Sequence, residues 1–150
     1  MVRTIAMSTL VAGAIDILYA ALMSIIFGRG PAAMLRTVAS GPFPGASEWG
    51  AAGSGLGLLV HFVLMAIMAA CFMIAARNWP VLMAKPIHAG VAYGLVTYAV
   101  MNLVVVPLRF DVPLPTQPRA IFSQLFAHIF LVGIPIALIA SKGLRERSIA

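Results

Sequence analysis

Three ionisable side chains interrupt long apolar stretches of this sequence: Asp16, His61 and His128. Another apolar stretch carries two hydrogen-bonding side chains, Tyr98 and Asn102. Ionisable groups at membrane depth usually face the interior of a helix bundle, pair with one another and mark functional paths. Because histidine exchanges protons near neutral pH, these residue types favour a polar layer that binds a small ligand or ion or handles protons.

The same residues permit two kinds of cofactor site. Two imidazoles and one carboxylate, here His61, His128 and Asp16, form a recognised ligand set for a divalent metal such as zinc or iron. Two histidines at similar depth on different helices are also the minimum for haem b held by two histidines. Arg109 and Arg119 at the outer span ends would then meet the propionates. The spacing of these residues selects neither group.

A purely structural role is a further alternative for these side chains. We expect Asp16 to be hydrogen-bonded to His61 or His128 inside the bundle, since an unpaired carboxylate in lipid is costly. Such a bond could simply fix the register of two helices. The chain would then be an accessory subunit of a larger membrane complex, or a homo-oligomer, with no site of its own.

Four long apolar runs must position these groups. They cover residues 4–27, 51–76, 86–107 and 120–140, and each is near or above the roughly 20 residues that a helix needs to cross the hydrocarbon core. The composition, 62% hydrophobic and 9% charged, is too apolar for a soluble domain. The sequence therefore predicts an all-α fold, with residues 1–150 forming a single integral membrane domain of four transmembrane helices. Continuous rather than alternating apolar runs exclude a membrane β-barrel.

The polar residues share one depth in these predicted helices. At about 1.5 Å of rise per residue, Asp16, His61, Tyr98 and His128 lie roughly 12–16 Å below the outer ends of their spans. Small residues share their helical faces, as in the series Gly53, Gly57 and His61 and the series Gly90, Gly94, Tyr98 and Asn102. Small residues let helix backbones approach closely in lipid, so each polar face is predicted to point into the bundle.

Basic residues at the ends of the runs predict the orientation. The side of the N-terminus carries Arg3, Arg77, Lys85, Lys142, Arg145 and Arg147, and the other side carries Arg29, Arg36, Arg109 and Arg119. The excess favours cytoplasmic termini. The loop of residues 28–50 would then be outside, where Pro31 begins a short interfacial helix. Because the net charge of +6 is spread over span ends, we expect lipid rather than nucleic acid as the partner.

Motifs for common enzyme reactions are missing from the sequence. It has no G-x-S-x-G, H-E-x-x-H or C-x-x-C motif and no phosphate-binding glycine loop, so an enzymatic role is the less favoured interpretation. Cys71 stands alone in an apolar run and is predicted to be a packing residue. Asp16 interrupts the first run, unlike the uninterrupted apolar region of a signal peptide, so this run is predicted to be a retained span.

Four stretches, "IDILYA", "LLVHFVLM", "VMNLVVVPL" and "FAHIFLVGIPIALIA", resemble those of small, functionally uncharacterised four-span inner-membrane proteins of proteobacteria. A looser similarity is to the YagU-type proteins, whose long outer loops this chain does not match. The resemblance covers Thr4 to Leu144 and implies a bacterial cytoplasmic (inner) membrane and a four-helix plan, without a known reaction. The positions that it picks out are Asp16, His61, Asn102, Pro107, His128, Gly133 and Pro135.

Overall fold

The computed structural model describes residues 1–149, with the side chains of residues 1–144. This part of the chain contains helices and turns and no strand. Four helices are long and apolar enough to cross a membrane: Val2–Ile26, Gly50–Asn78, Pro86–Phe110 and Pro118–Leu144. The prediction of an all-α fold with four long apolar helices is confirmed, and these are the features of a multi-pass membrane protein.

The first two spans are uninterrupted helices, whereas the third and fourth are each divided by a π-helical segment. The first two are α1 (Val2–Ile26) and α3 (Gly50–Asn78). The third consists of α5 (Pro86–Tyr98), the π segment η2 (Ala99–Val105) and α6 (Val106–Phe110). The fourth consists of α7 (Pro118–Phe126), the π segment η3 (Ala127–Gly133) and α8 (Ile134–Ile149). The connections contain α2 (Pro31–Ser40), the 3₁₀ helix η1 (Pro44–Glu48) and α4 (Val81–Ala84).

Proline and left-handed residues mark the helix boundaries. Pro31, Pro86 and Pro118 begin α2, α5 and α7, where the missing N–H would have had no partner in the helix. Gly28 follows α1 with φ of 73°, and Asp111 ends α6 with φ of 50°. Glycine reaches this region freely, and aspartate is one of the few other residues that visit it.

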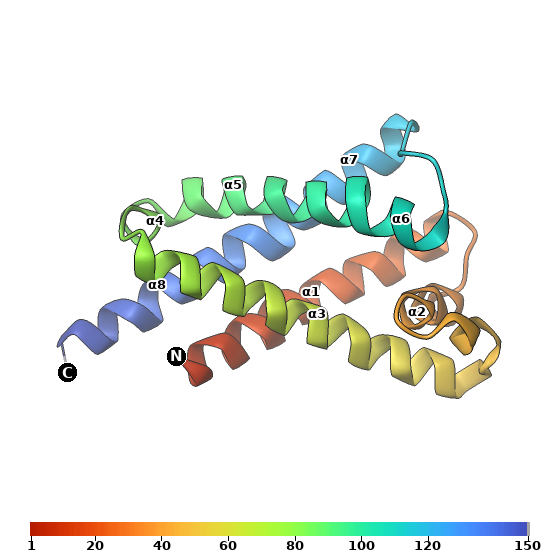
Figure 1. Cartoon of the computed structure of the whole chain (residues 1–150), viewed down its shortest axis with the longest axis horizontal. Helices are drawn as coiled ribbons and strands as arrows, with labels where there is room; N and C mark the ends of the chain where they lie inside the picture. The colour runs from red at the N-terminus through yellow and green to blue at the C-terminus, as the bar shows by residue number, and fades with distance from the viewer. Residues whose placement is uncertain (150) are drawn as a thin grey trace.

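The spans are arranged so that both ends of the chain lie together. α1 contacts both α3 and the fourth span, and the fourth span contacts α5. Figure 1 shows both termini at the end of the bundle that carries α4, whereas α2 lies at the opposite end. The connection between the third and fourth spans also lies at the end of α2.

Glycines bring the third and fourth spans into backbone contact. A Cβ added at Gly90 would lie 2.6 Å from the Cα of Ile134, and one added at Gly94 would lie 2.5 Å from the Cα of Ile129. Gly133 meets Gly90 and Gly94 from the fourth span. No side chain fits at these distances, so the small-residue face predicted for the third span does point into the bundle.

The small residues of the second span serve a different contact from the predicted one. A Cβ added at Gly57 would collide with the carbonyl group of Leu35 in α2, and one added at Gly53 would collide with the carbonyl oxygen of Ala46 in η1. This part of the face therefore packs against the 28–50 connection rather than against another span. The connection is thus part of the packed structure.

Arg109 ties the third span to the end of α2. Its Nε donates a hydrogen bond to the carbonyl oxygen of Gly41, and its Nη2 donates one of 2.8 Å to the carbonyl oxygen of Ser40. Both carbonyls lie at the C-terminus of α2, where a positive charge is favourable. The guanidinium is engaged by the protein itself, so it is not free for the haem propionate that the sequence suggested.

The interior is built from small and flexible side chains. Phe72, Met73, Val132 and Ile136 are its largest fully buried members, and alanines fill much of the rest. Large apolar side chains face outward along every span, among them Leu18, Ile67, Leu108 and Phe122. In water such a surface would be unstable, whereas lipid solvates it.

Candidate functional site

His61 of α3 contacts α1 beside Asp16, the carboxyl group that interrupts the first apolar span. The imidazole is buried, and its Nε2 lies 2.9 Å from the carbonyl oxygen of Gly13. Its Nδ1 lies 4.0 Å from Oδ2 of Asp16. Gly13 and Asp16 are three residues apart on α1, so one turn of α1 offers both groups to the same ring.

The contact between His61 and Asp16 is an ion-pair distance and is longer than a hydrogen bond. The two side chains are 11% and 20% exposed. The predicted hydrogen bond from Asp16 to a histidine is therefore present only as this looser approach to His61. Among the described residues, no hydrogen bond or ion pair joins Asp16 to His128.

The bond to the Gly13 carbonyl determines which nitrogen of the His61 ring faces Asp16 as an acceptor when the ring is neutral. A carbonyl oxygen only accepts, so the Nε2 of His61 carries a hydrogen. In the neutral ring Nδ1 is then an acceptor, and it faces the carboxyl group of Asp16. A carboxylate is also an acceptor, so the two groups repel unless one proton lies on the imidazole or on the carboxyl. One further proton, on the imidazole or on the carboxyl, would remove this repulsion.

The absence of a side chain at Gly13 makes this geometry possible. A Cβ there would lie 2.7 Å from Cε1 of Phe62, next to His61. The Phe62 ring also meets the imidazole edge to face, with centroids 5.3 Å apart and an angle of 81°. The sequence did not predict the bond to the Gly13 carbonyl, because nothing in a residue type shows that a helix carbonyl accepts a second bond.

A second polar pair joins the third and fourth spans. Nδ2 of Asn102 lies 3.2 Å from Nε2 of His128 and 3.4 Å from the carbonyl oxygen of Tyr98. The Tyr98 ring meets the imidazole with centroids 6.0 Å apart at an angle of 75°. Nδ1 of His128 is buried without a hydrogen-bond partner in the described part of the chain.

The two members of this second pair lie in the two π segments. Asn102 is in η2 and His128 is in η3. Each segment ends two residues before a proline, Pro107 or Pro135. Proline removes a backbone donor and crowds the preceding turn, and a wider turn accommodates it. Isolated π turns occur frequently at functional sites, and the only sequence signal for them here is the pair of prolines.

The two pairs lie at a similar level of the bundle. Tyr19 of α1 is hydrogen-bonded to Ser123 of α7 at 3.0 Å, and Thr4 of α1 meets Gly143 of α8. These contacts fix an antiparallel register that sets Asp16 near the level of His128. α1 also contacts η3. The sequence predicted one layer, and the structure divides it into two pairs. The Tyr19–Ser123 bond between the spans was not foreseen.

The predicted metal and haem sites do not agree with the geometry of these residues. No group of three His, Cys, Asp or Glu residues that could hold a metal ion occurs in the described residues, so Asp16, His61 and His128 are not a three-ligand metal site. The Nε2 atoms of both histidines are engaged by Gly13 and Asn102. This arrangement does not fit a haem held by the two rings.

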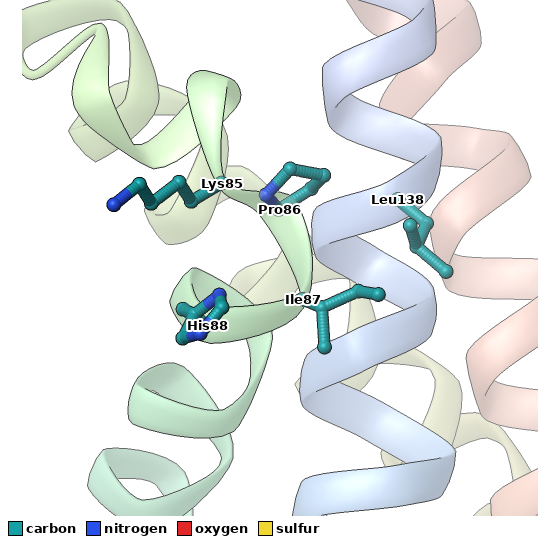
Figure 2. Close-up of a pocket in the computed structure, with 5 residues that line it drawn as sticks. All are labelled: Lys85, Pro86, Ile87, His88 and Leu138. Atoms are coloured by element: carbon teal, nitrogen blue, oxygen red, sulfur yellow. The ribbon is translucent and has the colours of Figure 1, made fainter.

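Two cavities lie away from the five predicted site residues. One of about 340 Å³ is lined by Lys85, Pro86, Ile87, His88 and Leu138, where α5 begins beside α8. Figure 2 shows Ile87 directed toward α8 and His88 on the other side of its helix. Another of about 390 Å³ lies between α3 and the third span and is almost wholly apolar. Neither is lined by any of the five predicted site residues.

Comparison with known proteins adds no relative: no family model, no curated protein and no solved structure matches the chain.

Proposed function

We propose that this chain is a multi-pass protein of a bacterial cytoplasmic membrane in which the Asp16–His61 pair binds and exchanges a proton. The observation that carries the proposal is the placement of His61. One ring nitrogen donates to the Gly13 carbonyl, and the other faces the Asp16 carboxyl at 4.0 Å. Of the activities that the residue types permit, proton exchange requires no cavity and no third ligand.

The free-energy cost of burying a carboxylate supports a proton shared between Asp16 and His61. A carboxylate at membrane depth is costly, and such groups are usually paired. Sharing one proton with an imidazole removes most of this cost, because the pair is then either neutral or a contact between opposite charges. Histidine is the side chain best suited to exchange that proton near neutral pH.

The membrane placement rests on the charges and the fold together. Six basic residues at the end of the two termini against four at the other end favour a cytoplasmic position for both termini. α2 then lies at the outer interface, with Pro31 at its start and Arg109 bonded to its end. The resemblance to small four-span inner-membrane proteins of proteobacteria supports the bacterial membrane.

Infrared difference spectra recorded while the pH of reconstituted protein is changed would test the proposal. The carboxyl bands that arise from Asp16 should be missing in Asp16→Asn and should be altered in His61→Gln, whereas the bands of the other carboxyl groups should remain. Asp111→Asn is the matched control, because Asp111 lies in a left-handed turn outside the spans, where asparagine is tolerated. If Asp16→Asn gives the same difference spectra as the parent protein between about pH 4 and pH 9, Asp16 does not exchange a proton and the proposal fails.

A structural role is the second candidate, and one specific observation favours it. The bond from His61 to the Gly13 carbonyl holds α1 to α3 whether or not Asp16 titrates. The chain would then be an accessory subunit or a homo-oligomer in which both pairs only fix helix register. This alternative predicts infrared spectra in which Asp16 keeps one protonation state throughout.

A further inference from the structure

We propose that His128 is a second proton-binding site, and that its protonation breaks the Asn102–His128 hydrogen bond. This bond, called the clasp below, joins the third span to the fourth. The proposal concerns different residues from the Asp16–His61 pair and does not require that pair to exchange protons.

The orientation of the Asn102 amide follows from its two partners. Its nitrogen lies 3.4 Å from the carbonyl oxygen of Tyr98, which only accepts, and 3.2 Å from Nε2 of His128. An amide NH₂ group has two hydrogens, one for each of these contacts. A flipped amide would set its own oxygen against the Tyr98 carbonyl. Asn102 is therefore the donor, and Nε2 of His128 must present its lone pair.

Protonation of His128 removes this acceptor. Both nitrogens of an imidazolium are donors, so a hydrogen on Nε2 would face the NH₂ group of Asn102. No rotation of the amide repairs this without losing the bond to Tyr98. The neutral ring carries its hydrogen on Nδ1, which has no partner in residues 1–149. Asn102 thus makes the only hydrogen bond of this ring that the described residues provide.

The titratable and charged groups near His128 are the other groups that could influence its protonation. α1, α5, α7 and α8 contact η3. At the level of the ring, α5 carries Tyr98, and α1 carries Asp16 and Tyr19. The basic residues on α7 and α8 lie toward the two ends of the fourth helix: Arg119 near the start of α7, and Lys142, Arg145 and Arg147 near the end of α8, where Glu146 also occurs in the sequence. His88 and Arg3 lie at the inner ends of α5 and α1. Among the described residues, Asp16 is the carboxyl group at this level, and no hydrogen bond or ion pair joins it to His128.

The π segments η2 and η3 are the positions at which the third and fourth spans could bend. The two π segments contain the clasp, and Pro107 and Pro135 prevent regular α-helical bonding beyond it. Below the clasp, the glycine contacts of Gly90, Gly94 and Gly133 hold the two spans together. Loss of the Asn102–His128 bond should therefore separate α6 from α7 at the outer end, while the glycine contact stays closed.

Spin-label distances across the outer ends test this clasp. Labels would be attached through Leu108→Cys and Phe122→Cys in a Cys71→Ser background, since Leu108 and Phe122 are 81% and 71% exposed. We expect the distance distribution in lipid nanodiscs to become longer or broader as the pH is lowered in steps from about 8 to about 4, a range that covers ordinary histidine titration and extends below it. An unchanged distribution in the otherwise native protein would overturn the proposal without any substitution in the clasp.

Three variants separate the clasp from other causes of a pH response. His128→Gln offers an acceptor that does not titrate, so its distribution should stay narrow throughout this pH range. Asn102→Leu removes the donor and should give the low-pH distribution at every pH. Asp16→Asn abolishes the first proton site but should leave a pH response in place. A pH response of the spin-label distances that persists in His128→Gln would contradict the clasp. A failure to detect an infrared signal from Asp16 would count against the Asp16–His61 proposal and would leave the clasp unaffected.

Discussion

At the scale of single residues, His61 is held in one orientation beside Asp16. The Gly13 carbonyl occupies one ring nitrogen and turns the other toward the carboxyl group. Removing either partner leaves a buried polar group without compensation, which costs more than the pair contributes as a whole. The two substitutions should therefore be coupled.

A double-mutant cycle measures this coupling. Asp16→Ala and His61→Ala should each destabilise the fold, by about 3–5 kcal/mol at most, and the double variant should lose less than the sum. The measurement is reversible unfolding in detergent. His88→Ala combined with Asp16→Ala is the control, because His88 is exposed at the start of α5 and distant substitutions usually add. Strict additivity for Asp16 and His61 would mean that the 4.0 Å contact carries no energy.

At the scale of elements, the pattern of small residues predicted contacts correctly without predicting their partners. The i, i+4 series from Gly90 to Gly94 points into the bundle, as expected, and the segment that it meets there is the fourth span. The similar series from Gly53 to Gly57 meets α2 and η1 instead. A stripe of glycines shows that something comes close but does not say which segment. Only the folded connection supplies that information.

Gly57 and Gly55 provide a matched test of that contact. Both are glycines of α3, but a side chain at Gly57 would collide with Leu35, whereas Gly55 has open space around it. Gly57→Leu should destabilise the fold by about 1–3 kcal/mol or more through overpacking. Gly55→Leu should be neutral or slightly stabilising, because leucine favours helix over glycine by up to about 1 kcal/mol. Equal thermal stability of the two variants in detergent would contradict the packing of α2 on α3.

The π segments were not foreseen from the sequence, although their cause is in it. The sequence predicts that the third span ends at Pro107, whereas the structure continues that helix to Phe110 by widening the turn before the proline. Pro135 lies within the fourth span for the same reason. A proline in an apolar run can end a helix, kink it or widen it, and packing decides between these outcomes.

At the scale of the whole molecule, composition and run length were enough to predict the four helices. Their apolar stretches are long, so the helical assignment does not depend on fine sequence detail. The prediction of a single polar layer was only partly right. Depth along each helix follows from counting residues, but the rotation of each helix does not, and rotation separates Asp16–His61 from Asn102–His128. Contacts between helices, not residue types, decide that grouping.

The orientation in the membrane is open to a direct test. In a Cys71→Ser background, Thr116→Cys lies in the connection between the third and fourth spans, and Ala84→Cys lies in α4 at the opposite end. An impermeant thiol reagent added to intact cells should label residue 116 and spare residue 84, if both termini are cytoplasmic. The reverse labelling pattern would show that the bundle is inserted the other way.

The central claim, that Asp16 and His61 share one proton, is tested most directly by nitrogen NMR of the imidazole. Protein labelled with ¹⁵N-histidine would be titrated in nanodiscs, with the His61 signals assigned through His61→Gln. We predict that Nε2 keeps its hydrogen across the titration, and that Asp16→Asn changes the pH response of His61 whereas Asp111→Asn does not. The same His61 titration in the parent protein and both variants, or an Nε2 without hydrogen in the neutral ring, would contradict the shared proton.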